Sequence, residues 1–507
     1  MKSRLTLRRF LEIIPGFLAW SALVLPIALS NQLPEAVVVF VILFDLYWVY
    51  KAIIMTAHLL VGFRRHKQAM AVHWLSKAKR EQNFNKTYHA VIVATYKEAL
   101  PVLETTFQAL IDSDYPLKNL IVVLATEERD QESATSNAKS LEQTFGRRFG
   151  HFLVTKHPAN LPNEVKGKGG NITWAARELQ EKLDDWSISY EDVIVTTLDA
   201  DNRVDRQYFA ELTYRFLNHP APEHVSFQPI PMYFNNIWEA PLLSRLLAHG
   251  TMFWVLIESS RPWRLRNFSA HSQSMKALVK IDYWATDTIV EDGHQFWRSY
   301  FAYDGEYWVE PLFVPIYQDA VVAGSLWQSA RELYLQRRRW TWGISDFPYA
   351  IENCIKNTSA PFFDKWLKAL RLFEAHFTWS TQSLYIMVAG WVPIILNDTF
   401  NDTVLAYNFP IVASRLLTLA MVGMITNLTI GTLLMPQIED KRRRSRLLAL
   451  EWILMPIISP LYSVIFGAIP ALDSQTRLMF GIHPKEFRVT TKLRNVDGQS
   501  LPETIEA

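Results

Sequence analysis

Apolar and polar positions divide the chain into an apolar beginning, a mixed middle and an apolar end. Residues 11–30 contain one charge, Glu12, and residues 36–62 form a second apolar run. Each run is long enough to cross about 30 Å of hydrocarbon. A cleaved signal peptide would have a shorter apolar region and a small-residue cleavage site. The pattern therefore predicts a helical hairpin that stays in the membrane, with its polar turn at residues 31–35.

Charged residues around this hairpin predict its orientation. Basic residues precede it within residues 2–9 and follow it within residues 64–67. By the positive-inside rule, both ends of the hairpin lie in the cytoplasm. Three ionisable residues fall within the second span: Asp45, Lys51 and His58. Such residues normally face protein or water, so they either pack against neighbouring helices or mark a pathway.

Apolar runs return near the end of the chain. The uncharged runs 376–396 and 416–436 predict two further spans joined outside the cytoplasm, and the basic run 441–446 returns the chain to the cytoplasm. Residues 451–472 are long enough to cross again, but three prolines interrupt them. We expect a kinked or re-entrant segment followed by a cytoplasmic tail. A full crossing would give five spans instead of four.

Short β-branched runs alternate with amphipathic stretches between the two membrane regions. The predicted strands are 91–95, 120–126 and 193–198, and the predicted helices are 97–113, 131–145 and 171–183. This alternation predicts an α/β domain in which helices cover both faces of a mostly parallel sheet. The predicted organisation is a transmembrane hairpin at 1–62, a cytosolic domain at 63–365, a second transmembrane region at 366–472 and a cytosolic tail at 473–507.

Composition narrows the functional classes. Hydrophobic residues make up 49% of the 507 residues and charged residues 20%, which fits a protein that is partly membrane and partly soluble. The 52 basic and 50 acidic residues give a net charge of +2, which argues against a nucleic-acid-binding protein. The single cysteine, Cys354, excludes an intrachain disulfide and favours a reducing compartment. The sequence contains no Gly-rich fingerprint for phosphate binding.

Polar residues follow the predicted strands, where α/β sheets bind ligands. Asp199 and Asp201 come just after the strand at 193–198. Two carboxylates at this spacing suit Mg²⁺ or Mn²⁺, although Asp is also frequent in turns. Further on, the acidic pair Glu291 and Asp292 lies among apolar residues and predicts either a general base or a helix N-cap.

An arginine-rich stretch precedes the second membrane region. Within it, Gln336, Arg339 and Trp340 form a Q-x-x-R-W motif. Taken alone, this stretch is typical of a basic and aromatic belt at the membrane surface. Its position after a strand-end T-Y-x-E, a D-x-D and an E-D-G-H is what makes a functional role the better interpretation.

The order and spacing of these motifs resemble glycosyltransferase family 2. The resemblance is to its membrane-embedded branch, which holds cellulose and hyaluronan synthases and ceramide glucosyltransferases, and it covers roughly residues 30–470. It implies a cytosolic GT-A fold, a nucleotide-sugar donor, Mg²⁺ or Mn²⁺, and inversion at the anomeric carbon.

The resemblance also implies a nucleoside-binding site. Thr95, Tyr96 and Glu98 match the family's nucleoside-binding turn. Glu127, or its neighbour Glu128, stands where the family usually has an Asp that binds the base. This departure leaves the nucleotide base open.

Other matched residues would bind the donor diphosphate or take part in the transfer reaction. Lys168 lies in a stretch similar to the family's K-x-K-A-L-N and is a candidate for the diphosphate, while Asp199 and Asp201 match its metal motif and Asp199 also meets the donor. Glu291 and Asp292 match its T-E-D motif, which makes Asp292 the implied catalytic base.

The last matched residues concern the acceptor. Gln336, Arg339 and Trp340 match the motif with which the family holds the diphosphate and the acceptor sugar. Ala270 and His271 replace the expected Gly-Ser/Thr of an acceptor-side motif. The resemblance therefore does not identify the acceptor.

We expect an inverting hexosyltransferase that uses a UDP-glucose-like donor at the cytosolic membrane face, which in a bacterium is the plasma membrane. The acceptor is a growing polysaccharide or a lipid-linked molecule; so few spans favour a glycolipid product or a channel completed by other chains. A transporter with a regulatory nucleotide-binding domain and a non-catalytic nucleotide-sugar scaffold are the alternatives.

Overall fold

One eight-stranded sheet organises the middle of the chain in the computed structural model, which describes residues 2–490, 495–496 and 499–500. Its strand order is β3-β2-β1-β4-β7-β6-β8-β5. The first four strands in this order are parallel, as are β6 and β8, whereas β7 and β5 run antiparallel to their neighbours. The predicted α/β sheet is confirmed, and it is mixed in its second half. The strands are β1 (Tyr88–Ala94), β2 (Leu120–Glu127), β3 (His151–His157), β4 (Val193–Asp199), β5 (Arg203–Val204), β6 (Val225–Met232), β7 (His271–Ser274) and β8 (Trp308–Tyr317), and a separate pair is β9 (Asn495–Val496) with β10 (Gln499–Ser500).

Both faces of the sheet are buried. Along β1, Val91 and Val93 join the core on one face, whereas Ala90 and Ile92 join the core on the other. Alternate side chains of a strand point to opposite faces, so a strand buried on both sides is apolar throughout. This is why β1 and β2 are mostly apolar in the sequence.

Helices supply the layers on either side of the sheet. Residues of α4, α5, α7 and α8 pack in one core, and residues of α6 and α9 pack in the other. The helices of this middle part are α3 (Trp74–Ala78), α4 (Leu100–Ile111), α5 (Gln131–Phe145), α6 (Lys168–Asp185), α7 (Tyr208–Leu217), α8 (Leu242–Ser259), α9 (Met275–Lys280), α10 (Glu291–Ala302), α11 (Leu326–Thr341) and α12 (Asp346–Lys356).

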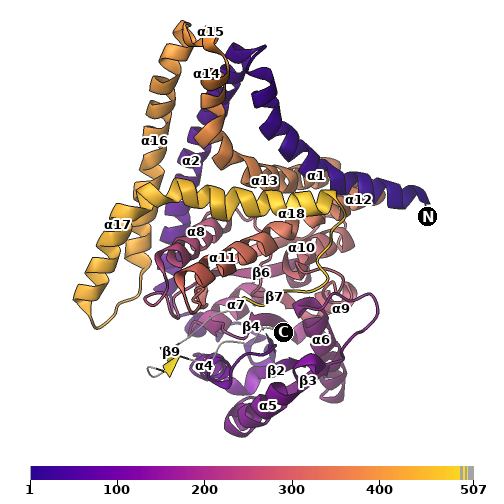
Figure 1. Cartoon of the computed structure of the whole chain (residues 1–507). Coiled ribbons are helices and arrows are strands. Elements are labelled where there is room, and N and C mark those ends of the chain that lie inside the picture. Colours follow the sequence, from indigo (N-terminus) through magenta and orange to yellow (C-terminus); the bar gives the residue numbers. More distant parts are fainter. Residues whose placement is uncertain (1, 491–494, 497–498, 501–507) are drawn as a thin grey trace.

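Four helices in the described part of the chain are long and apolar enough to cross a membrane. They fall at Leu7–Leu29 in α1 (Lys2–Leu29), at α2 (Pro34–Met70), at α16 (Val404–Leu434) and at Lys441–Met479. Figure 1 shows α1, α2 and α16 extending away from the sheet. The Asn397 side chain donates to the backbone carbonyls of Ser30 and Asn31 in the α1–α2 turn, so the two polar turns lie together at the end far from the sheet.

Two predicted membrane segments have a different form from the one expected. The run at 376–396 is not one helix, because α13 (Phe362–Val388) ends before a 3-10 turn at Ala389–Trp391 and the short α14 (Val392–Leu396). The four-residue α15 (Asp398–Asn401) then leads to α16. The expected domain boundary at residue 365 falls inside α13.

The last apolar segment is bent. α17 (Lys441–Ser463) passes through a π-helical turn at Val464–Ala468 into α18 (Ile469–Met479). In Figure 1, α18 lies across the molecule below α13, and it packs against α1 and α11. The chain therefore returns to the α/β domain after its last long helix.

Candidate active site

A rigid acidic turn ends β4. The backbone N–H of Asp199 donates to the side-chain oxygen of Asn202 at 3.0 Å, and the Asn202 N–H donates back to the Asp199 carbonyl at 3.0 Å. Asp201 Oδ2 accepts a hydrogen bond from the backbone N–H of Asp319, which follows β8. The exposed fraction of the Asp199 side chain is 37%, so a ligand can reach this carboxylate.

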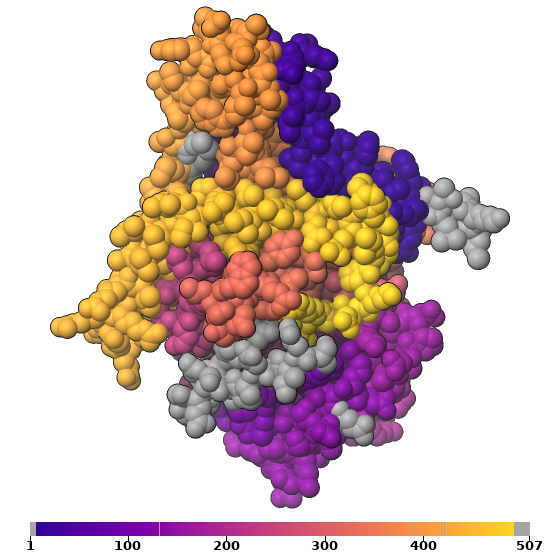
Figure 2. Space-filling view, viewed as in Figure 1, coloured from indigo at the N-terminus to yellow at the C-terminus, as the bar shows by residue number. Residues whose placement is uncertain are grey.

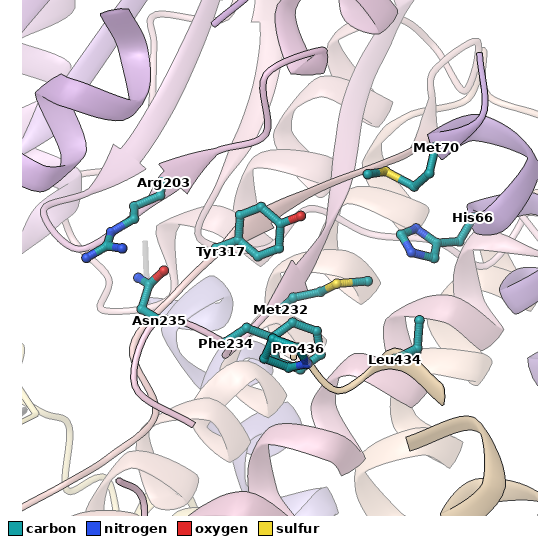
Figure 3. A pocket seen from close by; sticks show the side chains of 9 residues that line it. All are labelled: His66, Met70, Arg203, Met232, Phe234, Asn235, Tyr317, Leu434 and Pro436. Atoms are coloured by element: carbon teal, nitrogen blue, oxygen red, sulfur yellow. The ribbon is translucent and has the colours of Figure 1, made fainter. Parts of the chain in front are cut away.

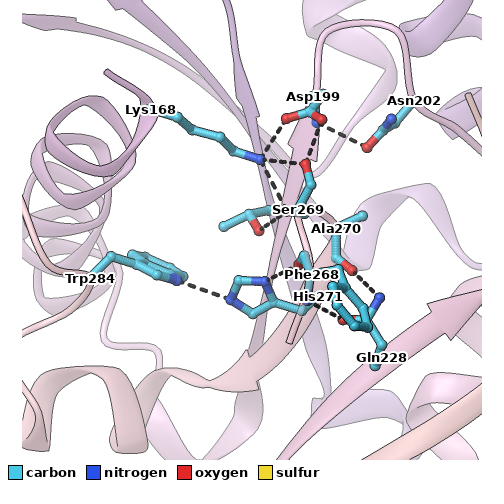
Figure 4. A network of polar contacts seen from close by, with 10 residues as sticks. Lys168, Asp199, Asn202, Gln228, Phe268, Ser269, Ala270, His271 and Trp284 are labelled. Carbon is cyan, nitrogen blue, oxygen red and sulfur yellow. Dashed lines mark hydrogen bonds and ion pairs between the residues drawn. The ribbon is translucent and has the colours of Figure 1, made fainter. Parts of the chain in front are cut away.

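Lys168 joins this turn from the first residue of α6. Its Nζ lies 2.6 Å from Asp199 Oδ1 and donates to the Ser269 carbonyl at 3.0 Å (Figure 4). Ser269 Oγ donates to the other oxygen of Asp199. Burial lowers the pKa of Lys168, but the attraction of Asp199 and of the acidic pair at Glu291 outweighs burial, so the pKa is raised above its ordinary value. Lys168 is therefore a fixed cation beside a carboxylate.

The acidic pair is brought to Lys168 by close packing of two helix starts. A Cβ on Gly169 would lie 2.4 Å from the Ala285 carbonyl and 3.1 Å from the Glu291 Cβ, so only glycine lets α6 approach α10 this closely. The start of α10 then holds Glu291 and Asp292 near Lys168. The K-x-K-x-x-N stretch thus works through its glycine as well as through its lysine.

Glu291 of the pair is buried, and Asp292 is half-buried. Burial, and then repulsion from Asp292, raises the pKa of Glu291 to about 8. Burial also raises the pKa of Asp292, although the Gly293 N–H that donates to Asp292 Oδ1 at 2.7 Å and the charge of Lys168 oppose the rise. The N-cap of α10 is Val290, which makes no side-chain cap. The acidic residues are therefore not the N-cap of α10 but lie in its first turn, where Asp292 accepts the Gly293 N–H.

The Q-x-x-R-W residues lie on the last turns of α11. Burial lowers the pKa of Arg339, and the negative charges of Asp199, Glu291 and Asp292 oppose this effect, so its guanidinium faces the same acidic site. Gln336 is buried, and its Oε1 has no hydrogen-bond partner among the described residues. An orphaned buried acceptor of this kind is free to bind a ligand.

Trp340 has a different environment from these two neighbours. It is partly buried and packs beside Met435 and Leu448 at the membrane helices and beside Leu247 and Leu333. Part of the Trp340 indole therefore contributes to the packing of the α/β domain against the membrane helices.

The turn after β1 carries the residues expected at the nucleoside. Thr95 Oγ1 donates to Glu98 Oε2 at 2.8 Å, and the Tyr96 N–H donates to the same oxygen. Burial raises the pKa of Glu98 to about 7, against these hydrogen bonds. Glu98 therefore stabilises the turn itself.

Glu127 and Glu128 are separated by the structure. Glu127 is buried at the end of β2 and binds the guanidinium of Arg129, whose centre lies 4.6 Å from the Tyr96 ring. Glu128 is exposed and accepts from the Ala159 N–H. Glu127 is thus the one of the two that is linked, through Arg129, to the turn after β1. Sequence reasoning missed Arg129, a basic residue with no motif to mark it.

The acceptor-side motif is tied into the fold. Gln228 accepts from the Phe268 N–H at 2.7 Å and donates to the Ala270 carbonyl at 3.0 Å (Figure 4). His271 lies between the Phe268 carbonyl and the Trp284 indole N–H, and burial lowers its pKa to about 4. His271 is therefore a neutral structural residue.

Residues after α18 also reach the site, which sequence reasoning missed. The Phe487 N–H donates to the Lys166 carbonyl at 2.6 Å, and the Phe487 ring lies 4.0 Å from the Arg339 guanidinium. Arg488 accepts from Arg339 through its carbonyl and pairs with Glu332 at 2.7 Å. Figure 2 shows this yellow segment beside α11. In the sequence it appears only as a basic tail, part of which lies outside the described residues.

Comparisons with known proteins give structural likeness only. No protein-family model and no curated protein matches the sequence. The structure is similar to the mannosyltransferase PcManGT from Pyrobaculum calidifontis, solved with GDP-Man and Mn²⁺, at 14% identity and a TM-score of 0.45, over 84% of this chain and 99% of that one. It is also similar to S. aureus TarS 1–349, at 12% identity and a TM-score of 0.36 over 82% of this chain and 96% of that one, and to the same protein with UDP-GlcNAc at 11% identity, the same TM-score and the same coverage.

Proposed function

We propose that the chain is an inverting glycosyltransferase that moves a hexose from a nucleotide sugar of the UDP-glucose class to a growing polysaccharide or a lipid-linked acceptor. Transfer takes place at the cytosolic membrane face. The observation that carries the proposal is the convergence of Asp199, Asp201 and Lys168 with Arg339 and Asp292 at one end of the sheet. Few reactions need two strand-end carboxylates, two cations and a separate half-buried carboxyl together.

The residues at the end of β4 fit a divalent cation. The described residues contain no group of three or more His, Cys, Asp or Glu side chains placed to hold a metal. Mg²⁺ is commonly held by one or two carboxylates together with substrate phosphates and water, rather than by a full protein cage. Asp199 and Asp201 would hold Mg²⁺ or Mn²⁺ in this way, and the cation would neutralise charge on the donor diphosphate.

Other residues of the chain would stabilise the leaving group and accept the proton. Lys168 and Arg339 stabilise the negative charge that develops on the leaving diphosphate. Asp292 takes the proton of the acceptor hydroxyl as its oxygen bonds to the anomeric carbon and the bond to the diphosphate breaks. A single displacement with one base inverts the anomeric carbon and needs no covalent intermediate.

The test is the release of nucleoside diphosphate. Purified protein in lipid is incubated with Mg²⁺ or Mn²⁺ and a panel of nucleotide sugars. We expect one sugar class to give release that stops with EDTA and with Asp292→Asn. The matched control is Asp287→Asn, the same substitution at an exposed residue of the loop that leads into α10. Absence of release with every donor and with added glycan or lipid acceptors would refute the proposal.

The transporter alternative draws little support from the second span. Lys51 Nζ lies 3.1 Å from Glu374 Oε1, and His58 Nδ1 lies 2.8 Å from Ser260 Oγ, so both residues bind neighbouring elements. Of these three residues, Asp45 has a buried carboxylate oxygen without a hydrogen-bond partner among the described residues. The non-catalytic scaffold is disfavoured because Asp201, Asp292 and Arg339 are all in place.

A further inference from the structure

A cluster of charged side chains lies where α2, the loop after α8 and the first part of α13 meet. Lys51 Nζ of α2 lies 3.1 Å from Glu374 Oε1 of α13, and Arg264 lies 3.9 Å from the same carboxylate. Arg264 also lies 3.8 Å from Glu258 at the end of α8, which pairs with Arg261 at 2.5 Å. These ion pairs join three parts of the chain that are far apart in the sequence.

The cluster contains more cations than carboxylates. Burial, and then repulsion from Arg264, lowers the pKa of Arg371, which has no ion-pair partner among the described residues. The charged residues linked in this way are the six cations Lys51, Arg261, Arg264, Arg266, Lys368 and Arg371 and the three carboxylates Glu258, Asp364 and Glu374. The carboxylates therefore balance only half of the positive charge.

Several of these cations have little contact with water. The exposed fraction of the side chain is 10% for Arg261, 13% for Lys368 and 22% for Arg264. The Nε of Arg261 is buried and has no hydrogen-bond partner among the described residues. Burying a charge without a counter-charge is costly, so the cluster favours the binding of an anion.

The position of the cluster along α2 matches the lipid head groups. From Pro34 to Lys51, α2 rises about 26 Å at 1.5 Å per residue, which is close to the ~30 Å thickness of the hydrocarbon. Beyond Lys51, α2 reaches the α/β domain, where His66 and Met70 line a cavity of about 430 Å³ with residues of β6, β8 and α16 (Figure 3). Lys51 therefore lies at the boundary between the membrane part and the α/β domain.

Exposed apolar side chains lie beside the cations. Phe363, Leu367 and Leu370 are spaced by four and three residues, so they share one face of α13, and all three are exposed. Trp263, in the loop after α8, is also exposed. Apolar and aromatic side chains next to basic residues are typical of elements that lie at a membrane surface.

We propose that this cluster binds the phosphate head group of an anionic membrane lipid, such as phosphatidylglycerol. Guanidinium groups suit phosphate because they form paired hydrogen bonds with it, and Arg264 and Arg371 would supply them. The acyl chains would lie along Leu367 and Leu370, which a free phosphate ion would leave uncovered. The inference concerns binding alone, so it is independent of the proposed glycosyl transfer.

Native mass spectrometry of the full chain in a neutral detergent tests the inference. The probes are phosphatidylglycerol and phosphatidylcholine with the same acyl chains, because both contain phosphate but only the first has a net charge. We expect phosphatidylglycerol to bind more tightly by a factor of about five or more. Equal affinity for the two lipids would overturn the proposal. Displacement of phosphatidylglycerol by an equal concentration of inorganic phosphate would also overturn it, because the site would then recognise free phosphate.

Variants of one arginine locate the site. Arg371→Gln removes a cation without breaking an ion pair, so the chain should fold and its affinity for phosphatidylglycerol should fall about fivefold, as ~1 kcal/mol per basic residue predicts. Arg371→Lys keeps the charge and should keep most of the affinity. The matched control is Arg148→Gln, which makes the same change in net charge at an exposed residue after α5, at the end of the α/β domain far from the long helices (Figure 1).

A second variant, Arg264→Gln, removes the other arginine proposed to bind the phosphate and should also weaken binding. Unchanged affinity in both Arg371→Gln and Arg264→Gln would place the lipid elsewhere and refute the site. An equal loss of affinity in Arg148→Gln would attribute the binding to net charge and would refute it as well.

Discussion

Replacing Asp292 by Asn removes proton acceptance while nearly preserving shape. The Asn side-chain oxygen can still accept the Gly293 N–H that Asp292 accepts at 2.7 Å. Because Val290 is the N-cap, α10 loses no cap, and the free energy of unfolding should change by less than the ~1 kcal/mol typical of a lost cap. The variant should therefore fold and still bind the donor.

The Asp292→Asn substitution should lower the turnover rate far more than it lowers the free energy of unfolding. Loss of a general base lowers the rate about 10²–10⁴-fold. At about 1.4 kcal/mol per factor of ten, this corresponds to ~3–6 kcal/mol of transition-state stabilisation. Burial raises the pKa of Asp292, so in the unsubstituted enzyme the base is protonated at low pH and the rate climbs as pH rises through that pKa. The Asn variant should lose this limb of the pH profile.

The assay is a pair of measurements on one folded variant. Nucleotide-sugar affinity comes from a binding titration, and turnover comes from nucleoside-diphosphate release across pH, with Asp287→Asn as the matched control. Near-normal turnover in Asp292→Asn would remove Asp292 from the mechanism. Loss of donor binding together with turnover would instead assign it a structural role.

Three further predictions follow from the same geometry. Asp201→Ala should abolish metal-dependent donor binding, and EDTA should have the same effect. Donor binding that survives both would show that the D-x-D residues form a turn and hold no metal. Asp346→Asn removes a negative charge that raises the pKa of Asp292. The acidic limb of the pH–rate profile should therefore move to lower pH. An acidic limb at the same pH as in the unsubstituted protein would contradict this electrostatic coupling. A cysteine placed at the exposed Lys118 should resist impermeant labelling from outside intact cells, where the buried Cys354 gives no background, and efficient labelling would contradict a cytoplasmic domain.

Local patterns were sufficient to predict many of the elements. The helix predicted at 131–145 is α5, Gln131–Phe145, and the strand predicted at 120–126 is β2, which ends one residue later. The first residue of an element was harder to predict from the sequence. The helix predicted from residue 171 begins at Lys168, because glycines at 169 and 170 look like a loop while the packing against Ala285 requires a small residue there.

The sequence by itself determined the strands β1, β2 and β4, the long apolar helices α1, α2 and α16 and the residues at the strand ends. Periodicity and strand-end position depend on residues close together in the chain. The tertiary structure alone decided how Asp319 holds Asp201 across 118 residues, and how Arg488 meets Arg339 across 149. It also separated Glu127 from Glu128 and opened the cavity between β6, β8, α2 and α16. Such contacts depend on how whole elements pack against one another, and no local pattern of apolar and polar residues encodes that packing.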